Sequence, residues 1–314
     1  MKKLLIIRFS ALGDVAMLAP VVRATAEQCP ELEITVLSQQ RMADLFANLP
    51  ANVRFAGVDL KKQSLREIVE QLGSFDYVAD AHGVWRSWYI GWRMRLRGAR
   101  VRTIRKGRFA KWLLTHGFIH KPLTHTSERY AKVILDSCLP AVDQLLTTVR
   151  PLPSKHKEGI GMAPFAAHRG KVYPPERMER VVAMLSERGE KIVLFGSKEE
   201  QEILGAWAQK YPNVESVAGQ KSLAEELEII RGLRVMVSMD SANMHLASLV
   251  GTRVVSIWGA THPNAGFMGI GQSENDCIQR ELKCRPCSVY GNKRCKFGDY
   301  RCLDIQPEEI VARV

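Results

Sequence analysis

Short apolar runs rich in β-branched residues alternate with amphipathic stretches along the first half of the chain. This alternation is typical of a parallel sheet with helices on both faces. We expect strands at 4–8, 33–37, 53–58, 77–80 and 101–104. We expect helices at 15–28, 42–48, 65–72, 85–96, 109–116 and 128–138.

A second alternation follows a segment rich in proline and charge at 150–157, which we interpret as a linker. Its expected strands are 159–162, 191–195, 214–217, 235–239 and 254–258. The 314 residues suit two domains, at 1–153 and 158–314, the second with a Cys-rich loop at 277–302. We therefore expect an α/β fold of two doubly wound domains facing across a cleft, the usual ligand position in such folds.

The stretch 235–263 organises the second half, because it reads as strand, helix and strand. Asp240 and Ser241 stand where the helix begins, so the N–H groups of residues 241–244 would point at one spot outside the sheet edge. A helix N-terminus carries roughly half a positive charge and is a ready phosphate site. The alternative is that Asp240 and Ser241 only cap the helix.

The first strand-to-helix turn, residues 8–14, has one glycine where a dinucleotide fingerprint needs three. This argues against a nicotinamide or flavin enzyme. Asp14 stands at the carboxyl end of the first strand, where it would serve either as a helix cap or as a general base facing the cleft. Pro20 is expected to kink or shorten the following helix.

Charge is distributed unevenly, which favours an anionic partner for the first half. Of the net charge of +12, residues 1–150 carry +10. The segment 85–111 holds ten Lys/Arg and no acidic residue, with four aromatic residues near its start. It suits a solvated face, a nucleic-acid surface or, as we favour, contact with an anionic lipid surface and lipid phosphates. No apolar run approaches the roughly 18–20 residues that cross a membrane.

Five of the seven cysteines come late in the chain. Cys284 and Cys287 form a C-x-x-C pair, and Cys295 and Cys302 follow at wider spacings. Four thiolates would suit a structural zinc ion, and buried or free thiols are the alternative. A disulfide is less expected in a reducing cytoplasm.

Several motifs, in this order along nearly the whole chain, resemble those of the heptosyltransferases, glycosyltransferase family 9. They are Ser10-Ala11-Leu12-Gly13-Asp14 with Pro20, Asp80-Ala81-His82-Gly83, Lys171 ahead of Tyr173-Pro174, Phe195-Gly196-Ser197, and Asp240-Ser241 through His245 to Trp258-Gly259-Ala260-Thr261-His262-Pro263. The resemblance implies a GT-B fold of two Rossmann-like domains, acceptor-binding and donor-binding. It also implies inverting, metal-independent transfer of a heptose, usually from ADP-heptose, to the inner core of lipopolysaccharide.

By the same resemblance, Asp14 is the catalytic base, Lys171 stabilises the diphosphate leaving group and Asp240 contacts the donor. The other implied donor residues are Glu200, for which Glu199 competes, and Ser241, Ala242, Asn243, Met244 and His245. The expected acceptor residues are Ser10, Gly13, Gly83 and Arg86. Ala242 replaces a family glycine, which questions any positive φ there.

The resemblance also implies that the terminal helix, 307–314, crosses back to the first domain, and that closure hinges near 150–157. No cofactor is required by this mechanism. The expected location is the cytoplasm, peripheral on the inner membrane, with nucleic acid not expected as a partner. The alternatives are another GT-B nucleotide-sugar enzyme, such as an epimerase, and a non-catalytic RNA- or membrane-associated protein of the same fold.

Overall fold

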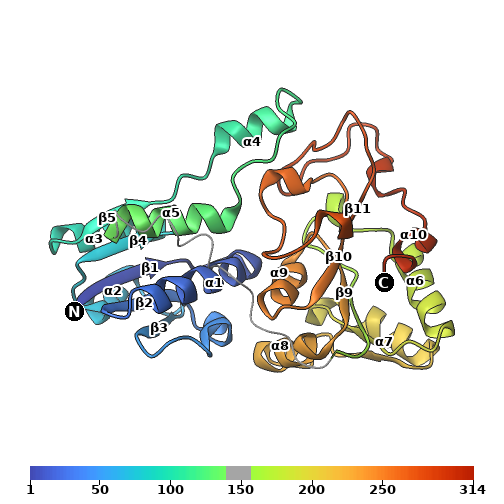
Figure 1. Cartoon of the computed structure of the whole chain (residues 1–314), viewed down its shortest axis with the longest axis horizontal. Helices are drawn as coiled ribbons and strands as arrows, with labels where there is room; N and C mark the ends of the chain where they lie inside the picture. The colour runs from blue at the N-terminus through green and yellow to red at the C-terminus, as the bar shows by residue number, and fades with distance from the viewer. Residues whose placement is uncertain (139–156) are drawn as a thin grey trace. The chain divides into compact units, whose positions relative to one another are not determined.

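A computed structural model describes residues 1–138 and 157–314 of the chain (Figure 1). The described residues form two compact units, each with its own parallel sheet. The first unit contains 1–107 and 124–138, and the second contains 108–123 and 157–314. The expected linker and hinge at 150–157 lie, except for Lys157, outside the described residues.

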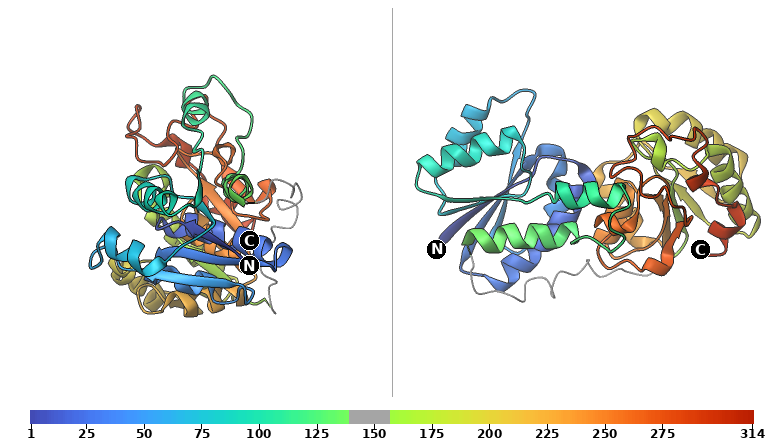
Figure 2. Two further views of the ribbon diagram at one scale, coloured as in Figure 1. Left: turned by 90° about the vertical axis from the view of Figure 1, so that its left-hand side faces the viewer. Right: turned by 90° about the horizontal axis from the view of Figure 1, so that it is seen from above.

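The sheet of the first unit has five parallel strands in the order β3-β2-β1-β4-β5. Helices α1 and α5 pack together on one face, and α2 and α3 pack together on the other (Figure 2). The strands are β1 Lys2–Ile7, β2 Leu32–Gln39, β3 Val53–Val58, β4 Tyr77–Asp80 and β5 Arg100–Thr103. The helical elements are α1 Leu12–Gln28, η1 Gln40–Phe46, α2 Leu65–Leu72, α3 Trp85–Leu96 and α5 Thr126–Cys138.

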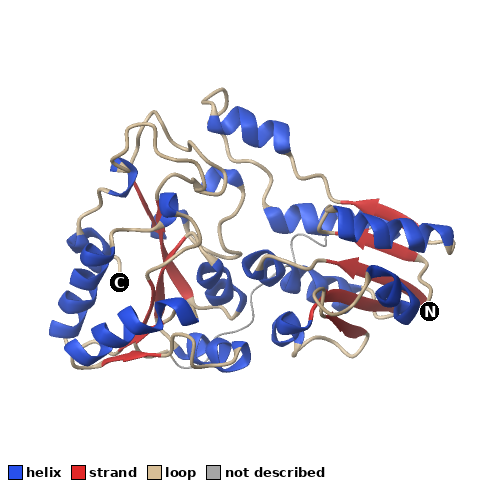
Figure 3. Ribbon diagram, turned by 180° about the vertical axis from the view of Figure 1, so that it is seen from behind, coloured by secondary structure: helices blue, strands red, loops and turns tan. Residues whose placement is uncertain are grey.

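The sheet of the second unit has six parallel strands in the order β11-β10-β9-β6-β7-β8. They are β6 Ile160–Ala163, β7 Ile192–Leu194, β8 Val214–Ser216, β9 Val235–Met239, β10 Arg253–Trp258 and β11 Cys277–Gln279. The helices are α4 Arg108–Thr115, α6 Pro175–Glu187, α7 Gln201–Lys210, α8 Leu223–Gly232, α9 Ala242–Leu249 and α10 Pro307–Val311. Loops dominate the chain after β10 (Figure 3). Short 3₁₀ turns occur in the loops throughout this unit: η3 Arg169–Lys171, η4 Lys198–Glu200, η5 Pro263–Ala265, η6 Glu274–Asp276 and η7 Arg301–Leu303.

The apolar runs form the central strands of these sheets, which helices bury on both faces. In β9 all five residues are buried, and in β1 the last four are. Parallel strands bring their carboxyl ends to one edge, and Ile7 of β1 is paired with Asp80 of β4. The turns that carry the motif residues therefore gather at the same edge of each sheet.

The expected domain boundaries, 1–153 and 158–314, differ from the observed division at residues 108–123. This arm lies in the first half of the sequence but packs with the second unit. Leu114 of α4 is buried, and the Lys111 ammonium lies 4.3 Å from the centroid of the Phe267 ring. The Leu123 N–H donates to the carbonyl of Asn264 (2.8 Å), whose side-chain amide donates to the carbonyl of His120 (2.7 Å). These contacts link segments remote in sequence, so the local pattern gave no sign of them.

Two expectations about helices concern Pro20 and the end of the chain, and the second of them is wrong. Pro20 does not shorten α1, which continues to Gln28, because the loss of one hydrogen bond is offset by burial of most of the helix. The terminal helix does not return to the first unit, since Ile310 and Val311 belong to the core of the second unit. Helix α10 packs on α6, and an ion pair joins Arg180 of α6 to Glu308 (3.2 Å).

Candidate active site

Asp14 lies in the first turn of α1, directly after the carboxyl end of β1. Its Oδ2 atom is 2.7 Å from Nη2 of Arg8, and the Tyr130 hydroxyl donates to Oδ1 at 3.3 Å. The N–H of Ala11 also donates to Oδ2 (3.3 Å), so the carboxylate closes the start of its own helix. The Asp14 side chain keeps 27% of its surface exposed. The carboxylate is thus both oriented by neighbours and open to a substrate hydroxyl.

Arg8 and Tyr130 form one assembly around Asp14. The Arg8 guanidinium donates to the carbonyl of Ala81 at 2.8 Å and stacks 5.6 Å from the centroid of the Tyr130 ring. Arg8 is nearly buried, and Tyr130 is fully buried on α5. Two rigid elements, β1 and α5, therefore fix the direction of the Asp14 carboxylate.

The neighbouring turn after β4 is built around two polar side chains. Asp80 is fully buried, and its Oδ1 accepts the N–H groups of His82 (3.0 Å) and Gly83 (2.8 Å). Gly83 has φ +62°, a conformation that favours glycine. Burial, with the nearby Arg8 charge, lowers the pKa of His82 to about 4. The imidazole is thus neutral at pH 7, and its Nδ1 accepts the N–H of Phe9 at 3.4 Å.

The structure thus places four of the five expected residues of the first unit, Ser10, Gly13, Asp14 and Gly83, in the turns after the adjacent strands β1 and β4. Ser10 and Gly83 are half-buried, and Gly13 is buried within α1. Arg86 differs from them because it is exposed on α3, and its guanidinium lies 5.4 Å from the centroid of the Trp85 ring.

In the second unit Lys171 and Asp240 form a buried ion pair. The Lys171 ammonium lies 2.9 Å from Oδ2 of Asp240 and donates to the Asp240 carbonyl at 3.0 Å. The two side chains are 16% and 5% exposed. The Cys-rich loop covers the stem of Lys171: Gly291 has φ +75°, and a Cβ atom there would lie 2.6 Å from Cγ of Lys171. Lys171 is therefore held at the carboxyl end of β9, at the start of α9.

The N-terminus of α9 is left open by its own residues. Within the described chain, the Ser241 side chain makes no capping hydrogen bond to the helix, and the first turn contains no acidic residue. The Ser241 hydroxyl lies instead 3.2 Å from that of Ser238. Backbone N–H groups and a nearby ammonium at one helix end are suited to holding a diphosphate.

The remaining donor residues on α9 are placed as follows. Ala242 and Asn243 are half-buried, whereas Met244 and His245 are buried, so Met244 would contribute through its backbone N–H. Ala242 is helical, so no positive φ is needed there. These residues are at the helix end where the sequence predicted them.

Glu200 is engaged locally. Its Oε2 atom accepts the N–H of Ser197 at 2.7 Å, which completes the capping box of η4. The contact with ribose hydroxyls stays a prediction, and binding there would use the other carboxylate oxygen or replace this cap.

Four thiols of the Cys-rich loop influence one another's pKa. Burial, together with Cys284 and Cys295, raises the pKa of Cys287, and burial, together with Cys287 and Cys295, raises the pKa of Cys302 to about 11. Among the described residues, no group of three or more His, Cys, Asp or Glu side chains is placed to hold a metal ion. The expected zinc site therefore stays a prediction that the side-chain positions do not support.

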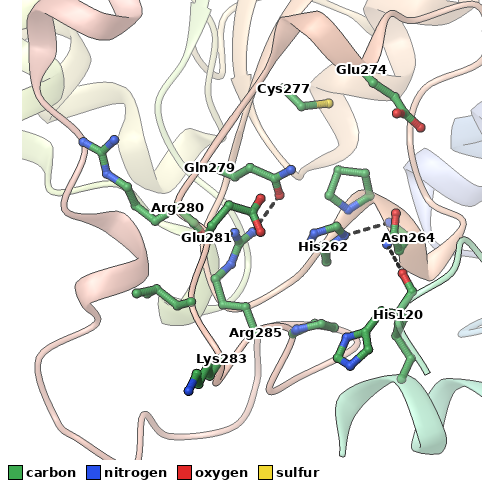
Figure 4. Close-up of a pocket in the computed structure, with 14 residues that line it drawn as sticks. His120, His262, Asn264, Glu274, Cys277, Gln279, Arg280, Glu281, Lys283 and Arg285 are labelled. Atoms are coloured by element: carbon green, nitrogen blue, oxygen red, sulfur yellow. Dashed lines mark hydrogen bonds between the residues drawn. The ribbon is translucent and has the colours of Figure 1, made fainter. Parts of the chain in front are cut away.

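Arg285 anchors this loop to the end of β10. Its guanidinium is half-buried and donates to the carbonyls of Thr261 (2.8 Å), Trp258 (3.2 Å) and Gly259 (2.5 Å). It also lines a pocket of about 560 Å³ in the second unit, beside His120 of the arm (Figure 4). Lys171 and Asp240 do not line this pocket. The loop and the arm thus build a second concave surface that the sequence did not predict.

Arg8, Tyr130 and His82 are the site residues that sequence reasoning missed. An arginine directly after four buried apolar residues of β1 signals a carboxylate partner, and this signal was available for Arg8. Tyr130 is 116 residues from Asp14, and nothing in the local pattern points to it. His82 was noted only as part of a motif.

The family model for glycosyltransferase family 9, the heptosyltransferases, matches residues 72–297. The chain belongs to this family. It is therefore a glycosyltransferase, and its two parallel sheets are those of the GT-B fold. The chain is also 24% identical to lipopolysaccharide heptosyltransferase 1 of Pseudomonas aeruginosa, covering 98% of this chain and 92% of the relative.

Solved structures show the same fold. The glycosyltransferase family 9 protein of Veillonella parvula matches with a TM-score of 0.74 at 18% identity, covering 99% of this chain and 95% of that one. The heptosyltransferase WaaC of E. coli with ADP matches with a TM-score of 0.65 at 21% identity, covering 86% and 92%. Both likenesses extend over both units of this glycosyltransferase.

Proposed function

We propose that this glycosyltransferase moves a heptose from ADP-heptose to the inner core of lipopolysaccharide, with inversion and without a metal ion. The observation that carries the proposal is the Lys171 ammonium, 2.9 Å from Asp240, at the uncapped N-terminus of α9. This arrangement supplies positive charge where a nucleoside diphosphate would leave. The P. aeruginosa relative's name and the ADP of the WaaC structure support the acceptor and the nucleotide.

In this mechanism Asp14 takes the proton of the acceptor hydroxyl while that oxygen attacks the anomeric carbon. The bond from this carbon to the diphosphate breaks, and the electron pair leaves with ADP. A single displacement inverts the anomeric configuration. Lys171 and the N–H groups of residues 241–244 would stabilise the new charge on the diphosphate. The Asp240 carboxylate would keep the ammonium in place and contact the donor.

We further propose that the enzyme works on the cytoplasmic face of the inner membrane, where a lipid acceptor would be met. Among the described residues, no helix is long and apolar enough to span a bilayer. Contact would therefore be peripheral, and the basic segment 85–111 supports it through attraction to anionic lipid.

The test is release of ADP from ADP-heptose in the presence of an inner-core acceptor and EDTA. The wild type is expected to turn over, and Asp14→Asn is expected to reduce kcat by about 10²–10⁴-fold. Asp136→Asn is the matched control, since the carboxylate of that exposed aspartate forms an ion pair with Lys132 on the surface of α5. NMR of the product would report the anomeric configuration. Turnover by Asp14→Asn equal to the control, or strict dependence on a divalent cation, would contradict the mechanism.

A further inference from the structure

Helix α3 has two apolar faces: one packs against the first unit, and the other is exposed in the part of the chain that the structure describes. Ile90 and Met94 are fully buried toward the sheet of the first unit. Four other large apolar residues stay exposed: Trp85 (67%), Trp88 (63%), Trp92 (46%) and Leu96 (67%). At about 100° per residue these four fall within roughly 80° of the helix circumference, opposite the buried residues. They form a continuous stripe, which we call the tryptophan face.

The tryptophan face is bordered by positive charge. On the same helical projection Arg86 and Arg93 lie on one side of the stripe and Arg95 on the other. Helix α3 contains no acidic residue, and none occurs until after residue 111. Tyr89, at the border of the stripe, accepts a hydrogen bond from Arg93 (3.1 Å). Aromatic rings flanked by guanidinium groups suit the headgroup layer of an anionic bilayer. The rings can insert at the boundary with the acyl chains, and the guanidinium groups can pair with lipid phosphates.

We propose that the tryptophan face of α3 inserts into the interfacial layer of an anionic lipid bilayer and anchors the first unit there. This inference deepens the proposed function, because it rests on a lipid-borne acceptor and names the surface that meets the membrane. Aromatic rings concentrate at membrane interfaces. Their burial in lipid and the attraction of arginine to anionic headgroups act on the same helix, and neither needs the donor or the acceptor to be bound.

The composition of the tryptophan face favours lipid over nucleic acid. Single-stranded nucleic acid is bound by aromatic rings that stack on bases within a positively charged groove. Here the rings project from the outer side of one helix, and the stripe ends in Leu96, which has no ring to offer a base. The side chain of Leu96, beside three indole rings, is suited to contact with the acyl chains of lipids.

The experiment is flotation of the full-length protein with vesicles of phosphatidylethanolamine and phosphatidylglycerol, and with vesicles of phosphatidylcholine alone, without substrates. We expect binding to the anionic vesicles that weakens with salt. Replacement of Trp85, Trp88 and Trp92 together by Ser should weaken binding by about tenfold or more, whereas Phe297→Ser should not. Phe297 is 49% exposed and lies in the second unit, so it is a matched aromatic control.

Two further readouts locate the contact. Brominated lipid should quench wild-type tryptophan fluorescence more than that of the triple variant, whose melting temperature reports that it still folds. Transfer to a deacylated, water-soluble acceptor should be unchanged in the triple variant, which separates failure of the anchor from failure of the proposed function. Absence of wild-type binding to anionic vesicles, equal binding by the triple variant, or binding of RNA without binding of vesicles would overturn the proposal.

Discussion

The two units use the same strand-to-helix turn in opposite ways. In the turn from β1 to α1, Asp14 lies in the first helical turn, so a carboxylate already occupies the helix N-terminus. In the turn from β9 to α9, Asp240 precedes the helix and is paired with Lys171, and the first helical turn carries no acid. A filled helix end presents negative charge for proton transfer, whereas an open one accepts an anion. The position of one carboxylate relative to the helix start therefore distinguishes the functions that we propose for the two turns.

The largest expected effect on stability concerns the buried pair of the second unit. Lys171→Ala leaves the Asp240 carboxylate buried without its ion partner, and removal of one member of such a pair costs about 3–5 kcal/mol of unfolding free energy. The double variant Lys171→Ala/Asp240→Ala should regain most of that loss in denaturant unfolding but should still bind ADP weakly. Full recovery of ADP affinity in the double variant would show that the pair serves stability alone.

A smaller effect, on kcat, is expected when Asp14 loses one of its two side-chain partners, Arg8 and Tyr130. Tyr130→Phe removes the hydroxyl that donates to Oδ1 at 3.3 Å. Hydrogen bonds to charged groups contribute about 1.5–3 kcal/mol, so we expect kcat to fall by about tenfold or more with KM unchanged. Tyr89→Phe, on α3, is the control. A change in KM without a change in kcat would contradict a positioning role for Tyr130.

The two units should also respond to pH in opposite directions. Burial lowers the pKa of His82 to about 4, so between pH 6.5 and 4 the unfolded chain binds more protons and stability falls as pH falls. Burial raises the pKa of Glu226 on α8 to about 7, so between pH 4.5 and 7 the folded unit binds more protons and stability falls as pH rises.

Melting temperatures measured from pH 4 to 8 check both signs. His82→Gln should reduce the loss of stability on the acidic side, and Glu226→Gln should reduce the loss toward neutral pH. If either variant leaves its own side of the profile unchanged, the corresponding group does not titrate as its burial predicts.

The smallest expected difference between the two units is in the rate at which their cysteine thiols are alkylated. Burial raises the pKa of Cys138 in the first unit to about 11. In the second unit slight burial of Cys295 is outweighed by hydrogen bonds from backbone N–H groups at Tyr300, Phe297 and Gly298, and its pKa is lowered. Iodoacetamide at pH 8, followed by peptide mass spectrometry, should therefore modify Cys295 well before Cys138. Equal protection of Cys284, Cys287, Cys295 and Cys302, reversed by a chelator, would instead show a bound metal.

The fold was largely predictable because buried parallel strands require short, almost continuous apolar runs, which are visible in the sequence. The bounds of α2, α3, β3, β4 and β9 were predicted to the residue. Element β11 was missed because it has three residues and only one of them is buried. The 108–123 arm and the return of α10 to its own unit depend on tertiary contacts, which leave no local pattern.

The positions of Asp14 and Asp240 were predictable because each follows a strand at the start of a helix, and Lys171, in the turn η3, was predicted from its motif. The supporting residues of the candidate site were not predictable, since Tyr130 reaches Asp14 only through the packing of α5 beside α1. The sequence also did not predict that a loop covers Lys171. Gly291 allows its backbone to approach the Lys171 side chain closely, and this contact is visible only in the folded structure. Motifs identify reacting groups, and packing identifies what orients them.

We propose above all that Asp14 takes the proton of the acceptor hydroxyl and that Lys171 stabilises the diphosphate leaving group. Calorimetric titration of ADP in EDTA into wild type, Asp14→Asn, Lys171→Ala and the control Lys191→Ala, whose ammonium is exposed on the second unit, tests this proposal most directly. We predict wild-type affinity for Asp14→Asn and Lys191→Ala, and a loss of about tenfold or more for Lys171→Ala. Weakened ADP binding by Asp14→Asn, or unchanged binding by Lys171→Ala, would contradict this division of function.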